Sequence, residues 1–365
     1  MSATWGNNLK LTIFGESHGV AIGGIIEGIP SGTELDLEFI NKEMGRRAPG
    51  HNNLSTPRKE SDQVEILSGF FQEKTTGTPL SFMIKNTNKN SKDYSEVRNI
   101  MRPGHGDYTG NIKYFGFNDY RGGGHFSGRI TAPLVFAGAI AKQILEAKGI
   151  FIGAHVKSIY DINDESFNSL GISADSLLSL KNQKLPVLNK GIGEKMEEAI
   201  IKAREDGDSV GGVIELMVLN PLEGLGMPFF DSVESRLAQI LFSVPAVKGI
   251  EFGAGFHIAS MRGSEANDSY IIKEGNIKTT SNNNGGILGG ITSGMPIIFK
   301  VAIKPTPSIS KLQSTIDIKN KVERTLEVKG RHDPCIVPRA IPVIEAVTAL
   351  TILDLLLDRI KEVNC

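Results

Sequence analysis

The sequence predicts an α+β fold in which antiparallel sheets pack on a few long helices. Short apolar runs of strand length come in groups, without the regular alternation with helices that marks a doubly wound sheet. Long amphipathic or apolar helical patterns are fewer. No low-complexity linker divides the chain, so we expect residues 1–365 to form a single domain.

The predicted strands are short apolar segments bounded by Gly, Pro or polar residues. Longer polar stretches between them predict surface loops at Asn86–Ser95, Asp161–Ser169 and Asn276–Asn284. The predicted strands are Leu11–Phe14, Val20–Glu27, Val64–Leu67, Leu80–Ile84, Ile152–Ile159, Val213–Val218, Phe252–Ala259 and Ile297–Ile303.

The helices are predicted from apolar periodicity and from residues that favour helix ends. Asp36 can cap a helix that runs through Gly45. The pattern from Thr131 to Lys148 has a proline in its first turn and a glycine after its last residue, which favours a helix there. The remaining predicted helices are Gly191–Glu205, Ser232–Phe242 and Ile341–Lys361.

Composition restricts the class of protein. Hydrophobic residues make up 40% and charged residues 22% of the chain, and its net charge is −1. This balance argues against a nucleic-acid or membrane-surface protein. The apolar stretch Ala340–Leu357 contains a proline and two acidic residues, so we expect a buried helix and no membrane span. Two cysteines and a polar N-terminus without an apolar core predict a cytoplasmic protein.

Glycine is abundant and clustered. The chain has 41 glycines, which concentrate in Gly122–Gly128 and Gly285–Gly294. Clustered glycines let backbone N–H groups approach a ligand closely, but they also suit tight turns at sheet edges. Both interpretations remain open from glycine content alone.

Two early segments place charged or titratable groups at turns. His18 lies in the Gly15–Gly19 turn between two predicted strands, where an imidazole can face a ligand or remain a structural turn residue. Arg46 and Arg47 end the first predicted helix before a Pro-Gly turn. They can grip phosphate or carboxylate groups, or they can be favourable charges at a helix C-terminus.

Two segments in the middle of the chain combine glycine with cationic groups. Arg102–Asp107 contains His105 and suits acid–base chemistry beside an anion, or a rigid surface loop. Tyr120–Arg129 is rich in glycine and leads into the Thr131 helix, as in a phosphate or flavin cradle. Its spacing differs from the common dinucleotide and P-loop motifs.

The late segments repeat this pattern. Asn284–Gly290 precedes the strand that ends in Lys304–Ser308, and Gly330–Cys335 places Asp333 between a cation and a turn. Asp333 can equally be a simple turn residue. We expect no metal site, because the His, Cys and Asp residues lack ligand spacing. Together these segments suit a small, multiply charged substrate and a phosphate-bearing cofactor.

These segments resemble the chorismate synthase family in order and along nearly the full length. The matching motifs are Gly15–Gly19, Arg102–His105, Asp119–Gly124, Gly285–Gly290, Lys304–Thr306 and Gly330–Cys335. The resemblance implies a β-α-β sandwich, with helices packed between antiparallel sheets, and a homotetramer. It also implies an anti 1,4-elimination of phosphate from 5-enolpyruvylshikimate-3-phosphate (EPSP), giving chorismate, with reduced FMN (FMNH2) and no net redox change.

The resemblance also assigns roles to residues. His18 and His105 match the family's proton donors to phosphate and flavin, and Asp333 matches the residue that manages the proton at flavin N5. Arg47, with Arg46 beside it, matches the region that holds substrate anions or a nicotinamide phosphate. The positions that match the family's cofactor contacts are Arg47, His125, Phe126, Ser127, Pro245, Ala246, Gly289, Lys304, Pro305, Thr306, Pro307, Ser308 and Arg331.

EPSP carries two carboxylates and a phosphate, so its site requires several arginines to offset desolvation. The candidates are Arg46, Arg47, Arg102, Arg129 and Arg339. Two segments depart from many relatives: His125–Ile130 replaces Arg-Ser-Ser-Ala-Arg-Glu, and Pro245–Ala246 replaces Asn-Ala.

Other functions remain to be separated from this one. Alternatives are an NADPH-dependent flavin reductase, a bifunctional synthase that reduces its own FMN, and a non-enzymatic flavin- or phosphate-binding sensor. We expect a monofunctional enzyme that depends on an external flavin reductase, with NADPH acting only indirectly. The sensor would need neither His18 nor His105.

Overall fold

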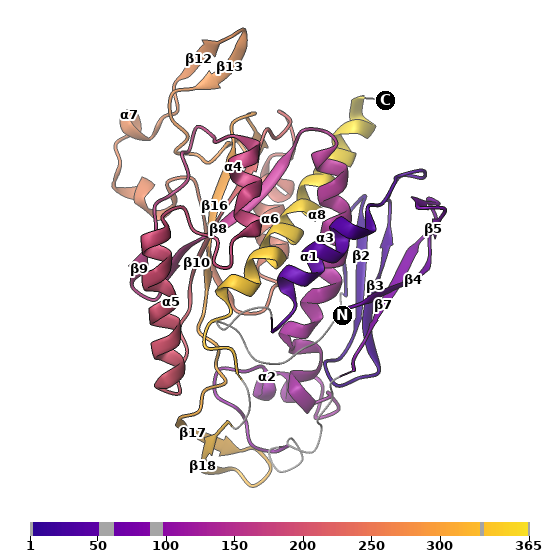
Figure 1. Cartoon of the computed structure of the whole chain (residues 1–365), viewed down its shortest axis with the longest axis vertical. Coiled ribbons are helices and arrows are strands. Elements are labelled where there is room, and N and C mark those ends of the chain that lie inside the picture. Colours follow the sequence, from indigo (N-terminus) through magenta and orange to yellow (C-terminus); the bar gives the residue numbers. More distant parts are fainter. Residues whose placement is uncertain (1–2, 51–61, 88–97, 329–331, 364–365) are drawn as a thin grey trace.

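The computed structural model describes residues 3–50, 62–87, 98–328 and 332–363, and its core contains two five-stranded antiparallel sheets. The first sheet has the order β1-β2-β3-β7-β4. It is built by the N-terminal part of the chain and lies at the right of Figure 1. Its strands are β1 (Thr4–Trp5), β2 (Lys10–Gly15), β3 (Ala21–Glu27), β4 (Val64–Ser68) and β7 (Leu80–Lys85).

The second sheet has the order β11-β16-β10-β8-β9. Antiparallel pairing sets its register: Val218 of β10 lies opposite Ile297 of β16 and Ile152 of β8. Its strands are β8 (Phe151–Ile159), β9 (Ile162–Asn163), β10 (Gly212–Leu219), β11 (Val247–Phe252) and β16 (Ile297–Ile303).

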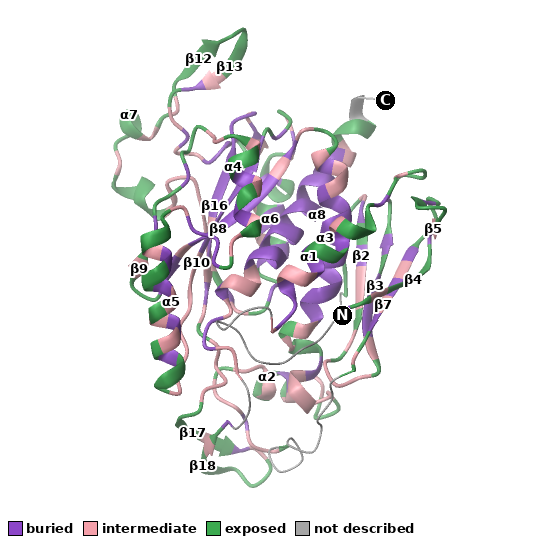
Figure 2. Cartoon of the chain, viewed as in Figure 1, coloured by how far each residue is buried: buried purple, intermediate pink, exposed green. Residues whose placement is uncertain are grey.

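Three helices fill the space between the sheets: α1 (Leu37–Arg47), α3 (Thr131–Glu146) and α8 (Val337–Val363). Both sheets turn an apolar face toward this layer, and Figure 2 shows the buried residues concentrated there. Helix α8 is long and apolar enough to cross a membrane, but 89% of that span is buried inside the protein. The predicted β-α-β sandwich is therefore confirmed, and α8 is its central helix.

Smaller elements surround this sandwich. Helices α4 (Ala174–Ser179) and α5 (Lys190–Glu205) cover the outer side of the second sheet, and the β12–β13 hairpin protrudes at the top of Figure 1. The other elements are β5 (Phe70–Phe71), β6 (Lys74–Thr75), α2 (Asp107–Lys113), η2 (Arg121–Phe126), η3 (Gly128–Ile130), η4 (Leu180–Asn182), η5 (Phe229–Asp231), α6 (Val233–Leu241), η6 (Gly255–Ser260), α7 (Gly263–Ala266), β12 (Tyr270–Lys273), β13 (Asn276–Thr279), β14 (Ile287–Leu288), β15 (Ile291–Thr292), β17 (Leu312–Asp317) and β18 (Val322–Glu327).

Local sequence explains most of these boundaries. Asp36 caps α1 as predicted, because its carboxylate accepts hydrogen bonds from the backbone N–H groups of Glu38 (2.9 Å) and Phe39 (3.0 Å). The strand prediction for Ile297–Ile303 coincides with β16.

Three of the sequence predictions are wrong. Phe252–Ala259 is not a strand: β11 ends at Phe252, and Gly253 and Gly255 have φ values of 56° and 58°, which turn the chain into η6. The stretches Asp161–Ser169 and Asn276–Asn284 are not entirely loop, because they contain β9 and β13, respectively. β13 pairs with β12. The sequence of β13 has no clear alternation of apolar and polar residues, so it did not predict a strand or its partner.

An ion-pair network lies inside the helix layer. Glu345 of α8 is fully buried and contacts Arg46 of α1 (2.6 Å) and Lys142 of α3 (2.6 Å), while Glu43 contacts the same two cations at 2.9 and 2.5 Å. The alternating charges offset the cost of burial and tie three helices together. This network fixes the end of α1, where Arg47 begins the candidate site.

Candidate active site

The Gly15–Gly19 turn packs against the glycine-rich loop. Ser17 donates its backbone N–H to the carbonyl of Gly124 (3.1 Å) and its hydroxyl to the carbonyl of Gly122 (3.2 Å). His125 contacts the same turn, with its Nδ1 2.7 Å from the carbonyl oxygen of Gly15. These contacts place His18, which is half-buried, against the loop that leads into α3.

The three glycines of this loop are required by its shape. Gly122, Gly123 and Gly124 have φ values of 60°, 86° and 53°. A Cβ at Gly122 would lie 2.5 Å from Nε2 of His18, and a Cβ at Gly124 would lie 2.2 Å from the carbonyl oxygen of Asp119. Glycine therefore permits the close approach of His18 to the loop.

His105 is held from both sides of its ring. Its Nδ1 lies 3.0 Å from the carbonyl of Pro103, and its Nε2 lies 2.7 Å from the hydroxyl of Ser308. The carbonyl can accept only, so Nδ1 carries the proton and Nε2 accepts from Ser308. Burial, together with repulsion from Arg102 and Lys304, lowers the pKa of His105 to about 4. The imidazole is therefore neutral at pH 7 in this state.

Two of the predicted cofactor segments lie beside His105. The backbone N–H of Lys304 donates to the carbonyl of Ala246 (2.9 Å), which joins Lys304–Ser308 to Pro245–Ala246. The ammonium of Lys304 donates to the carbonyl of Gly104 (2.6 Å) in the His105 loop. Ala246 has a φ of 76°, a conformation in which non-glycine residues other than Asn and Asp are rare.

A cluster of arginines lies around two carboxylates. Asp62 pairs with Arg47 and Arg129, and Asp333 pairs with Arg339 over 2.5 Å. The Nε of Arg339 also donates to the backbone carbonyl of Arg47 over 3.2 Å. Burial and repulsion from Arg339 and Arg129 lower the pKa of Arg47, despite its pair with Asp62. Among the described residues, three guanidinium groups thus lie around two carboxylates, an arrangement that suits an anionic ligand.

Hydrogen bonds connect this arginine cluster to both histidine loops. Asn86 accepts from Nε of Arg129 (3.1 Å) and donates its Nδ2 to the carbonyls of Glu16 (2.9 Å) and Gly19 (3.1 Å), on either side of His18. On the other side, Val210 donates its N–H to the carbonyl of Pro334 (2.9 Å), which follows Asp333.

The adjacent Ser209 donates its hydroxyl to the carbonyl of Thr306 (2.6 Å), in the segment that ends at Ser308. The structure therefore brings His18, His105, Asp333, Arg47, Arg129, Arg339 and the Lys304–Ser308 segment into one connected site.

Other predicted site residues have different surroundings. Arg46 does not join the arginine cluster, because it pairs with Glu345 and Glu43. Arg102 forms a bidentate pair with Asp107 (2.7 and 2.8 Å). Phe126 packs on Tyr114, which follows the last residue of α2. Ser127 caps the turn before α3, accepting from the N–H of Arg129 (3.3 Å).

Gly289 lies in the β14–β15 turn, and no atom of the described residues lies within 4 Å of a Cβ built at this position. Arg331 lies outside the described residues.

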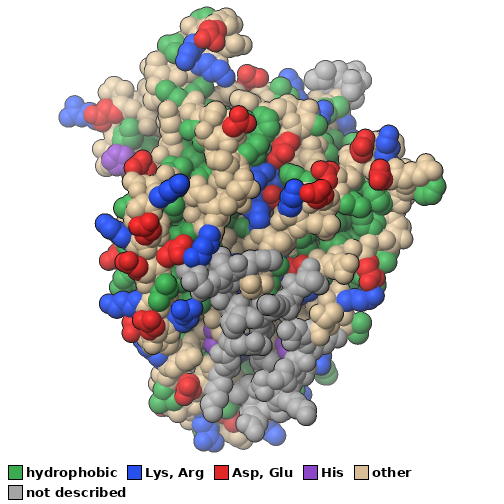
Figure 3. Space-filling view, viewed as in Figure 1, with side chains coloured by type: hydrophobic (Ala, Val, Ile, Leu, Met, Phe, Trp, Pro, Cys, Tyr) green, Lys and Arg blue, Asp and Glu red, His purple; other side chains and the backbone are tan. Residues whose placement is uncertain are grey.

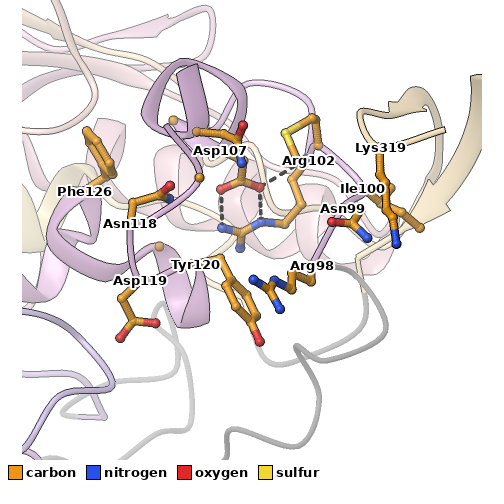
Figure 4. Close-up of a pocket in the computed structure, with 15 residues that line it drawn as sticks. Arg98, Asn99, Ile100, Arg102, Asp107, Asn118, Asp119, Tyr120, Phe126 and Lys319 are labelled. Carbon is orange, nitrogen blue, oxygen red and sulfur yellow. Dashed lines mark hydrogen bonds and ion pairs between the residues drawn. The ribbon is translucent and has the colours of Figure 1, made fainter. Parts of the chain in front are cut away.

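A pocket with a volume of about 370 Å³ adjoins the glycine-rich loop. Figure 4 shows the Arg102–Asp107 pair on its wall, with Arg98 near the ring of Tyr120. Its lining includes Gly123 and Phe126 but not His105. On the face in Figure 3, positive and negative side chains are interspersed over the described residues.

Sequence reasoning missed Asp62 and Asn86. Asp62 lies two residues before β4, and Asn86 follows β7 at the start of a segment predicted as a surface loop. A lone Asp or Asn beside a strand is common, and no local pattern distinguishes these two. Only their partners, Arg47 and Arg129, identify them as site residues.

Comparison with known proteins identifies the family. The family model described as chorismate synthase matches residues 9–357. The chain belongs to the chorismate synthase family. It is 47% identical over 354 residues to the chorismate synthase of Thermococcus kodakarensis, covering 97% of each chain, and 48% identical over 354 residues to that of Pyrococcus abyssi, again covering 97% of each.

The structure agrees with this assignment. A crystal structure of a chorismate synthase superposes with a TM-score of 0.76 at 32% identity, covering 97% of this chain and 93% of that chain. Chorismate synthases convert EPSP to chorismate in the shikimate pathway, and the chain is a carbon–oxygen lyase of this family. The family uses reduced FMN.

Proposed function

We propose that this enzyme binds EPSP and reduced FMN within the connected site, with His18, His105 and Asp333 as its catalytic residues. One observation carries the proposal. Segments from five parts of the chain meet through hydrogen bonds: the His18 turn, the His105 loop, the glycine-rich loop, Lys304–Ser308 and the residues around Asp333. Their convergence places two imidazoles and three arginines within one connected region.

The arginine cluster is the binding site for the anionic groups of EPSP. Among the described residues, the guanidinium groups of Arg47, Arg129 and Arg339 lie around the carboxylates of Asp62 and Asp333. An incoming carboxylate or phosphate would accept hydrogen bonds from these preformed guanidinium groups and be stabilised by their positive charge. When these arginines hold the anionic groups of EPSP, the departing phosphate remains able to accept a proton.

The residues beside Lys304 fit the phosphate and polar edge of FMN. Within the described part of the chain, Oγ1 of Thr306 is buried without a hydrogen-bond partner. Burial and then repulsion from Lys248 lower the pKa of Lys304, as expected where two ammonium groups face a shared anion site. Lys304–Ser308 and Pro245–Ala246 would hold the cofactor, with Arg331 from outside the described residues.

When bound in this site, reduced FMN would supply electron density transiently as phosphate leaves. His105 requires an anion before it can act as an acid. Without a ligand, burial and the neighbouring cations keep its ring neutral. A phosphate near Arg102 and Lys304 would cancel that repulsion, raise the pKa of His105 and allow Nε2 to take up a proton. Charging of the histidine is thereby coupled to ligand binding.

The subunits form a homotetramer in this proposal. Large apolar side chains are exposed on the described surface, including Phe229 (85%), Phe230 (91%) and Phe256 (85%), and the β12–β13 hairpin adds Tyr270 and Ile272. Exposed apolar groups of this size are typical of subunit interfaces. We further propose a cytoplasmic enzyme that receives reduced FMN from a separate reductase, with NADPH serving only as the source of electrons.

The deciding experiment is anaerobic turnover of EPSP with dithionite-reduced FMN. We expect stoichiometric chorismate and phosphate, and no net oxidation of the flavin. Turnover should stop with oxidised FMN, and adding NADPH without a reductase should not restore it. Restoration by NADPH alone would identify a bifunctional synthase, and flavin binding without any chorismate would favour a sensor.

A further inference from the structure

Asp62 is a buried carboxylate at the centre of the arginine cluster. Its side chain is 1% exposed, and it lies just before β4 with a φ of 38°. A left-handed conformation is uncommon for a residue other than glycine, although aspartate tolerates it better than most. The surrounding structure therefore fixes both the backbone and the carboxylate of this residue.

The two oxygens of Asp62 bind different arginines. Oδ2 accepts from Nε of Arg47 (2.9 Å) and also from its Nη2, while Oδ1 accepts from Nη1 of Arg129. Side chains of both arginines are almost fully buried, at 4% and 9% exposure. A carboxylate that bridges two planar guanidinium groups sets the orientation of each toward the other.

This bridge extends to the His18 turn. Arg129 uses Nη1 for Asp62 and Nε for Asn86, so its guanidinium plane is fixed by partners beside two different strands, β4 and β7. Asn86 then holds the carbonyls of Glu16 and Gly19. Displacement of Arg129 would thus disturb the turn that carries His18 as well as the anion site.

Charge compensation alone does not explain why Asp62 bridges the two arginines. Arg47 and Arg129 repel each other, and one negative charge anywhere nearby would reduce that repulsion. Placing one oxygen on each guanidinium group is a geometric feature that charge compensation does not require. It is the feature expected if the two groups must present a defined pattern of N–H donors to a ligand.

We propose that Asp62 is a positioning residue that orients Arg47 and Arg129 toward the anionic groups of the substrate. This assignment rests on the proposed function, since the ligand is EPSP. Asp62 itself touches neither substrate nor cofactor. It acts through the two arginines and, by way of Asn86, through the His18 turn.

The test uses two substitutions with different physical effects. Asp62→Asn keeps the shape and removes the charge, whereas Asp62→Glu keeps the charge and moves the carboxylate by one methylene. Misplacement of binding groups by about 1 Å can cost about 100-fold in rate. We expect kcat/KM for EPSP to fall about 100-fold in Asp62→Asn and at least about 10-fold in Asp62→Glu, at saturating reduced FMN.

The matched control is Asp354→Asn in α8. Asp354 is also fully buried and paired with an arginine, Arg236, but it also binds the backbone N–H of Leu9, away from the arginine cluster. The Asp354→Asn substitution should lower the melting temperature while leaving kcat/KM of the folded enzyme within about twofold of the wild-type value. Normal kcat/KM in Asp62→Glu would overturn the assignment, even if Asp62→Asn fails to fold.

A double-mutant cycle tests the route through Arg129. Arg129→Lys keeps the charge and removes the guanidinium fork. If Asp62 acts by orienting that fork, the double variant Asp62→Glu/Arg129→Lys should be little slower than the slower single variant. Fully additive losses would refute the route. Absence of chorismate formation by the wild-type enzyme would instead reject the proposed function, so the two failures are distinguishable.

Discussion

Ser308 donates its hydroxyl to Nε2 of His105 over 2.7 Å, although the two residues are 203 positions apart in the sequence. The same ring binds the carbonyl of Pro103 through Nδ1. The Ser308 contact joins the segment after β16 to the loop before α2, and the Pro103 carbonyl selects the tautomer in which Nε2 is unprotonated and can take up a proton. This relationship defines the state from which His105 would act.

Replacing His105 by alanine tests its catalytic role. We expect kcat to fall by about 10²–10⁴, the usual contribution of a general acid–base group, with a modest loss of FMN affinity. Anaerobic stopped-flow measurement of chorismate formation gives kcat, and flavin titration gives the affinity. Near-normal turnover would reduce His105 to a structural loop residue.

The pKa of His105 also predicts a pH dependence of stability. In the unfolded chain the pKa is about 6.5, and in the folded chain burial, followed by repulsion from Arg102, lowers it to about 4. Between these values the unfolded chain binds more protons, so the free energy of unfolding should decrease as pH falls from 6.5 to 4.

Denaturant titrations at several pH values measure this dependence. As pH falls, the free energy of unfolding should decrease less steeply in His105→Gln than in the wild type. His257→Gln, at an exposed position, is the matched control for loss of one imidazole. Equal slopes for wild type and His105→Gln, measured without ligand, would contradict the prediction.

Gly122 is predicted to be essential for the position of His18. In Gly122→Ala the new Cβ would lie within 2.4 Å of the imidazole, at a φ of 60°. We expect kcat/KM for EPSP to fall by at least about 10-fold, because the imidazole must move. Gly32→Ala is the control: Gly32 also has a positive φ (79°), but no atom of the described residues lies within 4 Å of its added Cβ. Similar activity losses in both variants would show that backbone strain alone is responsible.

The Asp333→Asn variant tests whether the role of Asp333 is catalytic or structural. Its carboxylate pairs with Arg339 over 2.5 Å, and Asp333→Asn preserves the shape but removes the base. We expect the variant to fold, assemble and bind FMN with EPSP, yet to turn over far more slowly. Single-turnover measurements on assembled enzyme would decide this. Activity within about threefold of wild type, a barrier change below about 1 kcal/mol, would reject a catalytic Asp333.

Glu345 should be important for stability. Burial by itself would raise the pKa of this carboxyl, but Arg46 and Lys142 outweigh burial and hold the pKa well below its ordinary value. Glu345→Gln leaves buried cations without their main partner, and we expect a loss of about 3–5 kcal/mol in the free energy of unfolding. Denaturant titration at pH 7 measures this.

The control for this network is Glu146→Gln at its edge, where the side chain is 24% exposed and pairs with Lys181. It should cost at most about 1 kcal/mol. The carboxylate of Glu345 stabilises the fold above its unfolded pKa, so the difference between wild type and Glu345→Gln should shrink as pH falls below about 4. A constant difference down to pH 3 would contradict the ion-pair explanation.

The sequence by itself determined the local features of this protein. The cap at Asp36 and the strand Ile297–Ile303 follow from backbone preferences within a few residues. Periodicity likewise predicted the long helices. The motif resemblance identified the family and named the histidines, because both depend on the order of residues along the chain.

The tertiary structure decided which charged groups act together. Arg46 and Arg47 are adjacent in sequence, yet about 100° of helical rotation separates their side chains. Arg46 therefore pairs with Glu345 in the helix layer, while Arg47 pairs with Asp62 in the site. Nothing local to either arginine predicts this difference. An ion pair depends on where a distant element places its partner, and packing of the two sheets on the helices sets that position.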